Sequence, residues 1–325
     1  MGNTITRRMM LQQTAGLAAA GLGAYWTAQG MTPILGAETG IPRRLLGKTG
    51  VSVSQLSFGC GSRFTNGYKT DEEALQILET ALRGGINYFD SAHSYGEGES
   101  ERRLGLFLQN HRKEVFLVTK LESRDPDEFL RQFELSLKRL QQDRVDLLHI
   151  HALENMEDLE RIGAKDGIYG RLEKLKEQGG TRFIGFSCHT EGKVAQAAIE
   201  RFQFDCCMLQ LNASKAGGFE DTALPAALKK KMGVVAMKAT GQEKLLGAGE
   251  GKAGIEDLMR YCWRLPVAAI NIGMPTMEML KQNLQLARAF QPMQKSEADL
   301  LQEHLTTSRA AMEAFFRTHS DFGIA

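Results

Sequence analysis

Eight short apolar runs, separated by amphipathic stretches, constrain the fold of this chain more than any other feature. They cover residues 53–59, 86–92, 114–120, 145–151, 181–187, 206–212, 233–238 and 267–273. Most are rich in β-branched or aromatic residues. Continuous apolar runs of this length, as opposed to strict alternation, indicate strands that are buried on both faces.

The stretches between the runs carry helix signals. The segment 70–85 begins at Thr70, a favourable N-cap, and ends in two glycines, while 126–140 begins with Pro126. Strands alternating with helices over about 240 residues predict an α/β fold, the (β/α)8 TIM barrel. An open doubly wound sheet is the alternative. It usually carries G-x-G-x-x-G after its first strand, and GCGSRF lacks the third glycine of that pattern.

Length and charge limit the function classes. The chain has 325 residues and a net charge of +1, so we do not expect a nucleic-acid-binding protein, which usually carries a basic patch. No linker-like stretch interrupts residues 45–292, and we expect one large domain over 38–325. The five cysteines show no C-x-x-C spacing, so neither a disulfide framework nor a metal site is expected.

The first 37 residues differ from the rest. Arg7 and Arg8 are their only charged side chains, and a mild Ala/Gly-rich apolar run follows. This is a signal-peptide pattern, and the paired arginines resemble a twin-arginine export signal. We therefore expect residues 1–37 to engage the twin-arginine export machinery, with the protein exported, periplasmic or membrane-associated through this segment. The alternative is a disordered tail on a cytoplasmic protein.

Polar side chains end most of the predicted strands. They are Asp90, with Tyr95 in the loop beyond, Lys120, His151, Ser187, Gln210 and Lys238. In a (β/α)8 barrel the carboxyl ends of all the strands meet at one face, which is where active sites lie. Burying a neutral polar group without a partner is unfavourable by roughly 1–3 kcal/mol. Their recurrence at strand ends therefore indicates a shared site.

Four of these residues form a proton-donating set. A phenol such as Tyr95 is a weak acid, with a reference pKa of about 10, and a neighbouring ammonium such as Lys120 strengthens it. Asp90 would hold that ammonium charged, and His151 would donate a hydrogen bond to a substrate oxygen. Such a set protonates a carbonyl oxygen while an external species, such as a hydride from a nicotinamide cofactor, attacks the carbon.

At this point the chain resembles the aldo-keto reductases. NYFDSAHSYGEGESERRLG, VFLVTK, VDLLHIH, TRFIGFS and MLQLN resemble the family's catalytic and cofactor-binding motifs. RRLLGKTGVSVSQLSFGCG resembles its opening β-hairpin and first strand, and the match covers residues 43–290. The resemblance implies a TIM barrel with an N-terminal β-hairpin and an NAD(P)-dependent oxidoreductase.

By this resemblance Tyr95 is the general acid/base, Lys120 and Asp90 tune it, and His151 orients the substrate carbonyl. His93 falls at a variable position of its motif, and we expect it to be an ordinary loop residue.

The resemblance also implies a site for NADP or NAD. The residues at matching positions are Gly59, Cys60, Gly61, Asp90, Ser187, Cys188, Gln210, Lys238 and Asn283. Cys188 replaces an asparagine that helps to hold the nicotinamide amide, and Cys60 replaces a threonine. The two thiols either line the pocket or are small apolar fillers.

Gly273 and Met279 replace the basic pair that binds the 2′-phosphate of NADP in many members, so the resemblance does not imply a preference between the cofactors. Lys281 lies near this pair in the sequence. Lys238 either binds a cofactor phosphate or an anionic substrate, or forms a salt bridge across the barrel mouth.

Three functions remain open. The first is reduction of an aldehyde or ketone, or oxidation of the corresponding alcohol. The second is a redox-neutral epimerase, dismutase or lyase with tightly bound NAD(P), and the third is a non-catalytic nucleotide-binding sensor, against which the intact catalytic set argues. Residues 295–319 predict an extra C-terminal amphipathic helix that packs on the outside of the barrel.

Overall fold

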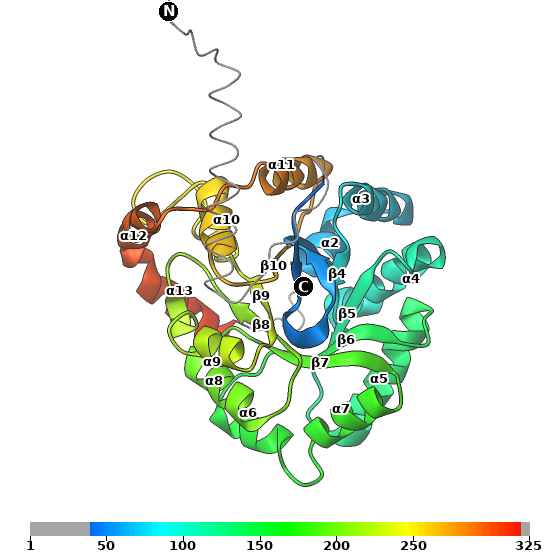
Figure 1. Cartoon of the computed structure of the whole chain (residues 1–325). Helices are drawn as coiled ribbons and strands as arrows, with labels where there is room; N and C mark the ends of the chain where they lie inside the picture. The colour runs from blue at the N-terminus through cyan, green and yellow to red at the C-terminus, as the bar shows by residue number, and fades with distance from the viewer. Residues whose placement is uncertain (1–39, 320–325) are drawn as a thin grey trace, which may run out of the picture.

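Eight parallel strands close into a barrel in the computed structural model, which describes residues 40–319 (Figure 1). The strands are β3 Leu56–Gly59, β4 Tyr88–Asp90, β5 Phe116–Leu121, β6 Val145–Ile150, β7 Thr181–Cys188, β8 Cys206–Gln210, β9 Gly233–Met237 and β10 Ala269–Ile272. They pair in chain order, and β10 pairs with β3 to close the ring. The predicted TIM barrel is confirmed, and the open sheet is wrong.

Helices surround the barrel and join its strands. They are α2 Ser62–Gly67, α3 Asp71–Arg83, α4 Glu99–His111, α5 Pro126–Leu140, α6 Met156–Ile162, α7 Ile168–Glu177, α8 Gly192–Arg201, α9 Ala223–Lys229, α10 Ile255–Arg264, α11 Met277–Arg288, α12 Lys295–His304 and α13 Thr306–Thr318. Three 3₁₀ segments are η1 Gly47–Thr49, η2 Tyr95–Gly98 and η3 Ala216–Gly218. The predicted caps are present, because Thr70 and Glu73 form a capping box at α3 and Pro126 opens α5.

A β-hairpin covers the amino-terminal end of the barrel. Its strands are β1 Arg43–Leu45 and β2 Ser52–Ser54. Leu46 and Val53 are fully buried in the same cluster as the inward-facing Tyr88 and Phe116. At Gly47, where φ is +52°, an added Cβ would lie only 2.3 Å from the backbone of Gly233. The hairpin therefore closes this end and leaves the carboxyl ends of the strands for a site.

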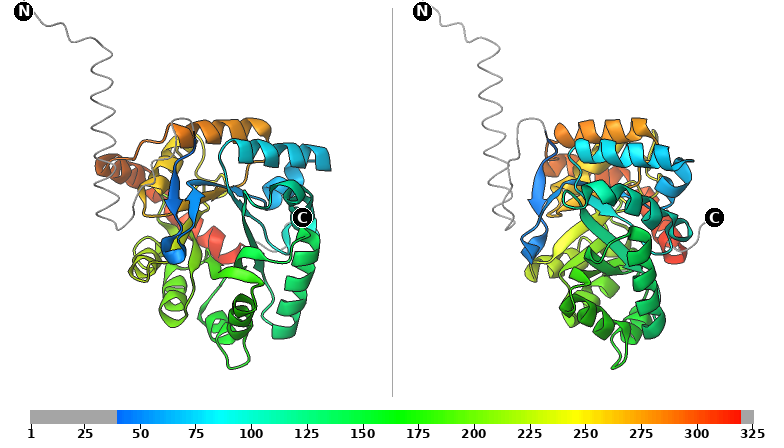
Figure 2. Two further views of the ribbon diagram at one scale, coloured as in Figure 1. Left: turned by 45° about the vertical axis from the view of Figure 1, so that its right-hand side comes forward. Right: turned by 90° about the vertical axis from the view of Figure 1, so that its right-hand side faces the viewer.

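The C-terminal tail differs from the prediction. It forms two helices that meet at Leu305, where the ψ angle is 1°. α13 lies at the opposite end of the molecule from the hairpin, as the right view of Figure 2 shows. Its buried Phe316 ring lies 6.1 Å from the His189 ring, which follows β7. The apolar face of α13 is thus buried over the loops at the carboxyl end and not only on the outer wall.

None of the helices between residues 40 and 319 has both the length and the apolar composition that crossing a bilayer requires. The predicted export signal, residues 1–37, lies outside the described part of the chain.

Candidate active site

A cavity of about 960 Å³ opens at the carboxyl ends of the barrel strands. This volume lies near the upper end of the range for small-molecule sites. Eight predicted site residues line it, namely Gly59, Gly61, Asp90, Tyr95, Lys120, His151, Ser187 and Lys238. The carboxyl-end location therefore agrees with the sequence prediction.

Strand alternation brings the catalytic candidates together. Tyr88, Phe116 and Val118 fill the lower barrel, and the next inward positions on β4 and β5 are Asp90 and Lys120. Both side chains are 1% exposed. The barrel thus carries a charged pair directly above its apolar interior.

The Lys120 ammonium satisfies its hydrogen-bonding capacity within this site. Its Nζ lies 2.6 Å from Oδ2 of Asp90, 2.7 Å from the carbonyl oxygen of Ser91 and 3.4 Å from the Tyr95 hydroxyl. A buried ion pair is tolerated when further hydrogen bonds complete it. The third contact directs a positive charge toward the phenol.

Tyr95 is brought to the cavity by a sharp reversal of the chain. It begins η2, in which Gly96 and Glu97 both have positive φ angles. The Arg139 guanidinium donates to the carbonyl oxygens of His93 and Glu97 and so holds this loop from α5. The Tyr95 ring packs edge-on against His151, with centroids 5.5 Å apart.

His151 follows β6 and is held through its backbone. Nη2 of Arg124 lies 2.9 Å from the carbonyl oxygen of His151 and 3.0 Å from that of Ala152. The same guanidinium forms a largely buried ion pair with Asp158. Ala152 has φ +48° and donates its N–H to Oγ of Ser187 at 2.8 Å. Arg124 therefore fixes the turn that presents both His151 and Ser187.

Four predicted cofactor residues do not line the cavity. Cys60 and Cys188 are fully buried in the core between barrel and helices, and burial raises the pKa of both thiols. Strand alternation turns Cys188 outward because Ser187 points inward. The structure thus supports the alternative of apolar fillers. Asn283 is buried within α11, away from the cavity.

Gln210 is buried at the end of β8, two residues beyond the cavity-lining Met208 and therefore on the same face of the strand. Its Nε2 donates to the carbonyl oxygen of Ala216 at 3.3 Å. Its Oε1 is buried without a hydrogen-bond partner among the described residues. A buried acceptor of this kind calls for a partner, and it lies on the same side of the barrel as Ser187.

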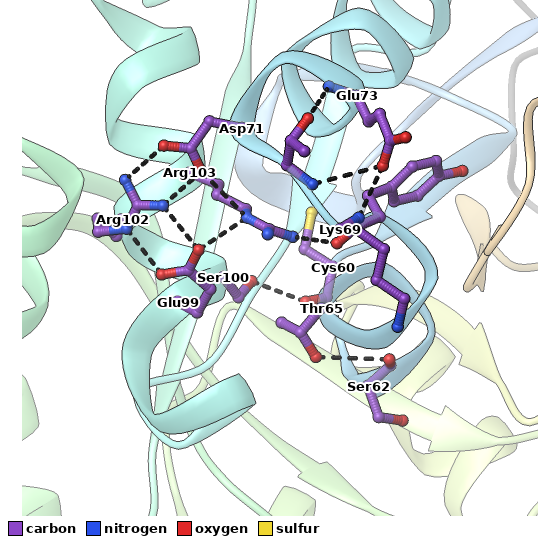
Figure 3. Close-up of polar contacts among 12 residues, drawn as sticks. Cys60, Ser62, Thr65, Lys69, Asp71, Glu73, Glu99, Ser100, Arg102 and Arg103 are labelled. Atoms are coloured by element: carbon purple, nitrogen blue, oxygen red, sulfur yellow. Dashed lines mark hydrogen bonds and ion pairs between the residues drawn. The ribbon is translucent and has the colours of Figure 1, made fainter.

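A polar network anchors the segment that follows β3 (Figure 3). Ser100 donates to the carbonyl oxygen of Cys60 at 2.7 Å, and Arg103 donates to that of Tyr68. Asp71 and Glu99 accept hydrogen bonds from Arg102. Helix α4 therefore holds both ends of α2, whose residues form part of the cavity rim.

Sequence reasoning missed several cavity residues. Asn271 lines the cavity from β10 and donates to Asp90. The sequence signal that could have identified Asn271 is an asparagine within the apolar run 267–273. Arg63 and Glu243 pair at 2.9 Å across the cavity mouth, and His319 reaches the cavity from the end of α13, 3.3 Å from Nζ of Lys238. No local pattern connects these distant positions.

Packing explains the surroundings of His93 and of two adjacent cysteines. His93 contacts Ser136 and Arg139 and does not line the cavity. Cys206 faces the barrel interior and Cys207 the outer core. All five cysteines are free, and residues 40–319 contain no group of side chains arranged to hold a metal ion.

Comparison with known proteins identifies the family. A model of the aldo/keto reductase family matches residues 55–303. L-galactose dehydrogenase from Arabidopsis thaliana is 37% identical over 165 residues, 46% of this chain and 49% of its own. D-threo-aldose 1-dehydrogenase from Pseudomonas sp. is 29% identical over 225 residues, 58% and 66% of the two chains. The match thus spans about half the length of the first of these relatives.

Solved structures show the same fold. An aldo-keto reductase from Bacillus halodurans in its holo form superposes with a TM-score of 0.68 at 24% identity, covering 80% of this chain and 95% of its own. A thermostable aldo-keto reductase in complex with the inhibitor epalrestat gives 0.67 at 26% identity, covering 80% and 98%. With the family model matching more than half of its length, the chain therefore belongs to the aldo/keto reductase family, as its motifs predicted.

Proposed function

We propose that the protein interconverts a carbonyl compound and the corresponding alcohol, with Tyr95 as general acid in reduction and general base in oxidation. One observation carries this proposal. The Tyr95 hydroxyl borders the cavity 3.4 Å from a lysine ammonium that is itself paired with Asp90. A cation at this distance stabilises a phenolate, and proton transfer to a developing alkoxide becomes easier.

Each residue around Tyr95 has a separate role in the proposed reaction. Lys120 stabilises the phenolate that remains after Tyr95 gives up its proton. His151, packed edge-on to the Tyr95 ring, is placed to orient the substrate oxygen toward the phenol. Asp90 keeps Lys120 charged and fixed in position. A bound nicotinamide cofactor supplies or accepts the hydride.

The residues around the cavity fit such a cofactor. Ser187 Oγ accepts from the Ala152 N–H and keeps its own hydrogen for an acceptor in the cavity. The buried Oε1 of Gln210 requires a donor. A carboxamide has a carbonyl oxygen that accepts and an NH₂ group that donates. Ser187 and Gln210 therefore suit the amide of the nicotinamide. At Gly61 an added Cβ would lie 3.5 Å from the Tyr95 ring, so glycine keeps this wall of the cavity open.

We propose further that NAD competes with NADP better than in members with the usual basic pair. Met279 is exposed on α11, and Gly273 packs against Arg63, whose charge is already paired with Glu243. Heat denaturation of protein purified without added cofactor, followed by chromatography, identifies any retained nucleotide. Retained NADP alone would contradict this preference. Retained nucleotide in an enzyme that does not consume free NADH or NADPH would favour the redox-neutral alternative.

The substrate is proposed to be a polyhydroxylated carbonyl compound, such as an aldose or its cyclic form. The rim beside Tyr95 is built from hydroxyl, amide and carboxylate side chains, namely Ser62, Thr65, Asn66, Ser94 and Glu97. Such groups match hydroxyl-rich ligands better than apolar ones. The names of two relatives, L-galactose dehydrogenase and D-threo-aldose 1-dehydrogenase, support the same class.

The substrate proposal is tested by following NADH and NADPH absorbance with a panel of aldoses and matched apolar aldehydes of equal chain length. We expect kcat/KM to favour the hydroxylated compounds. Better turnover of the apolar aldehydes would reject the substrate class alone. Failure of every carbonyl and alcohol with both cofactors would reject the proposed reaction.

Export by the twin-arginine route also remains our proposal, and it rests on Arg7, Arg8 and the apolar run that follows them. Replacing both with lysine and fractionating cells tests it. Retention of the variant in the cytoplasm supports export, and unchanged fractionation contradicts it.

A further inference from the structure

Asn271 occupies an unusual place in the wall of the barrel. It is a polar residue on β10 at an inward position, beside Ser57 of β3 where the ring closes. Its Nδ2 lies 2.8 Å from Oδ2 of Asp90. The same carboxylate oxygen accepts from Lys120 at 2.6 Å. One oxygen atom of Asp90 is therefore shared between a charged donor and a neutral one.

The Ser57 hydroxyl contacts the Asn271 amide from the opposite side. The Ser57 hydroxyl lies 3.1 Å from Oδ1 of Asn271 and 3.1 Å from the carbonyl oxygen of Ile270. Ser57 is fully buried. A reversed amide would place its oxygen against the Asp90 carboxylate and would lose that hydrogen bond, whereas the Ser57 hydroxyl can either donate or accept. The donor side of Asn271 is therefore directed to Asp90.

We infer that Asn271 is a positioning residue that sets the acidity of Tyr95 through Asp90 and Lys120. This rests on the proposed role of Tyr95 as proton donor. A carboxylate that accepts an additional N–H is less basic, and its negative charge is more delocalised. The effect passes from β10 through β4 and β5 to η2, because Asp90 contacts Lys120 and Lys120 contacts Tyr95.

Loss of the amide acts on Tyr95 in one direction. If Asp90 stays in place, its less compensated charge disfavours a nearby phenolate. If Asp90 moves, Lys120 loses its carboxylate partner. Burial then disfavours the ammonium form of Lys120 relative to the neutral amine, and the phenolate loses the cation that stabilises it. Either change makes Tyr95 a weaker acid.

The other titratable groups facing this chain of contacts do not replace Asn271. They are Tyr88, Cys60, His149 and His151. Burial raises the pKa of Tyr88 and of Cys60 and lowers that of His149, so the first two stay protonated and the third stays neutral near pH 7. His151 lies on the substrate side of Tyr95 and is the same in every variant below.

The test measures ionisation of Tyr95 without requiring turnover. An ultraviolet difference titration between each protein and its own Tyr95→Phe derivative isolates this phenol. Asn271→Leu should raise the Tyr95 midpoint by about 0.5–1 pH unit. Ser57→Ala, which leaves Asn271 in place but frees its amide, should raise it by less than Asn271→Leu does. If Asn271→Leu fails to fold, the inference is tested by whether Ser57→Ala raises the Tyr95 midpoint.

Asn87→Leu is the matched control. This asparagine lies at the amino-terminal end of the barrel, where it bonds Ser52 and Ser54 of the hairpin. The variant should lose stability and keep the Tyr95 midpoint. The pH dependence of kcat should shift with the midpoint in Asn271→Leu, by up to about tenfold in rate per pH unit. An unshifted or lowered midpoint overturns the inference, whereas a raised midpoint in a protein with no carbonyl turnover would reject the proposed function alone.

Discussion

The Nζ of Lys120 lies 3.4 Å from the phenolic oxygen of Tyr95, and both groups border the cavity at the carboxyl end of the barrel. The remaining donors of the ammonium are directed to Asp90 and to the Ser91 carbonyl. The position of the cation is thus set by the barrel itself, on β4 and β5, and the phenol is brought to it by the following loop.

Replacing Lys120 with methionine removes the cation and retains the unbranched side chain up to the position of Cε. We expect kcat to fall by about 10²–10³-fold, because Tyr95 is no longer acidified. The variant should also lose about 3–5 kcal/mol of stability, since Asp90 is left buried without its partner. The double variant Lys120→Met/Asp90→Asn should regain stability without regaining activity. Recovery of both would show that Lys120 has only a structural role.

Arg124 offers a test of how precisely His151 must be held. Arg124→Lys keeps the charge but cannot bond the carbonyls of His151 and Ala152 together with Asp158. We expect kcat/KM to fall by about tenfold, because small displacements of a positioning group are costly. Arg131→Lys, at an exposed pair on α5, serves as control. Steady-state kinetics that do not distinguish the two variants would reject this role.

Glu122 predicts a pH dependence of stability. Partial burial raises its pKa to about 7, with Glu101 adding repulsion. A carboxyl whose pKa is raised on folding contributes stability below its unfolded pKa, near 4.3, and loses it as pH rises through about 7. Glu122→Gln should therefore gain in Tm relative to the parent between about pH 5 and pH 8. Glu134→Gln, at an exposed position on α5, serves as the control, and an equal trend in both variants would reject the assignment.

The pair of Arg63 and Glu243 connects α2 to the loop after β9 across the cavity mouth. Both side chains are nearly half exposed, so the pair contributes at most about 1 kcal/mol. Glu243→Gln should speed nucleotide release by up to about fivefold, and the difference should shrink in high salt. Stopped-flow displacement measures this rate. Glu79→Gln, at a surface pair on α3, should leave it unchanged.

The fold and the catalytic set could both be predicted from the sequence, because both follow from the repeated alternation of strands and helices. Strand–helix alternation recurs eight times, and Asp90, Lys120 and His151 each stand at or just after a strand end. The carboxyl ends of the strands in a parallel barrel always meet at one face. Residues at the ends of different strands therefore lie close together in the folded protein.

Contacts between distant loops were not predictable in this way. Two such contacts join segments separated by 81 residues or more, Arg63 with Glu243 and Lys238 with His319. The hydrophobic periodicity of a sequence does not predict contacts of this kind. The tail was misjudged because an amphipathic pattern shows that one face is buried but not which surface covers it. Cys60 and Cys188 were assigned by position in a motif, whereas the direction of each side chain follows from its strand.

The central claim is that Tyr95 donates the proton in a nicotinamide-dependent reduction. The most direct measurement compares Tyr95→Phe with the parent in single-turnover oxidation of bound NADH or NADPH by the best aldose, alongside the Kd of the cofactor. We predict that the rate falls by about 10²–10⁴-fold while the Kd stays within about twofold, because the ring and its packing against His151 are kept. A rate near that of the parent, on a substrate that the parent reduces, would contradict the account.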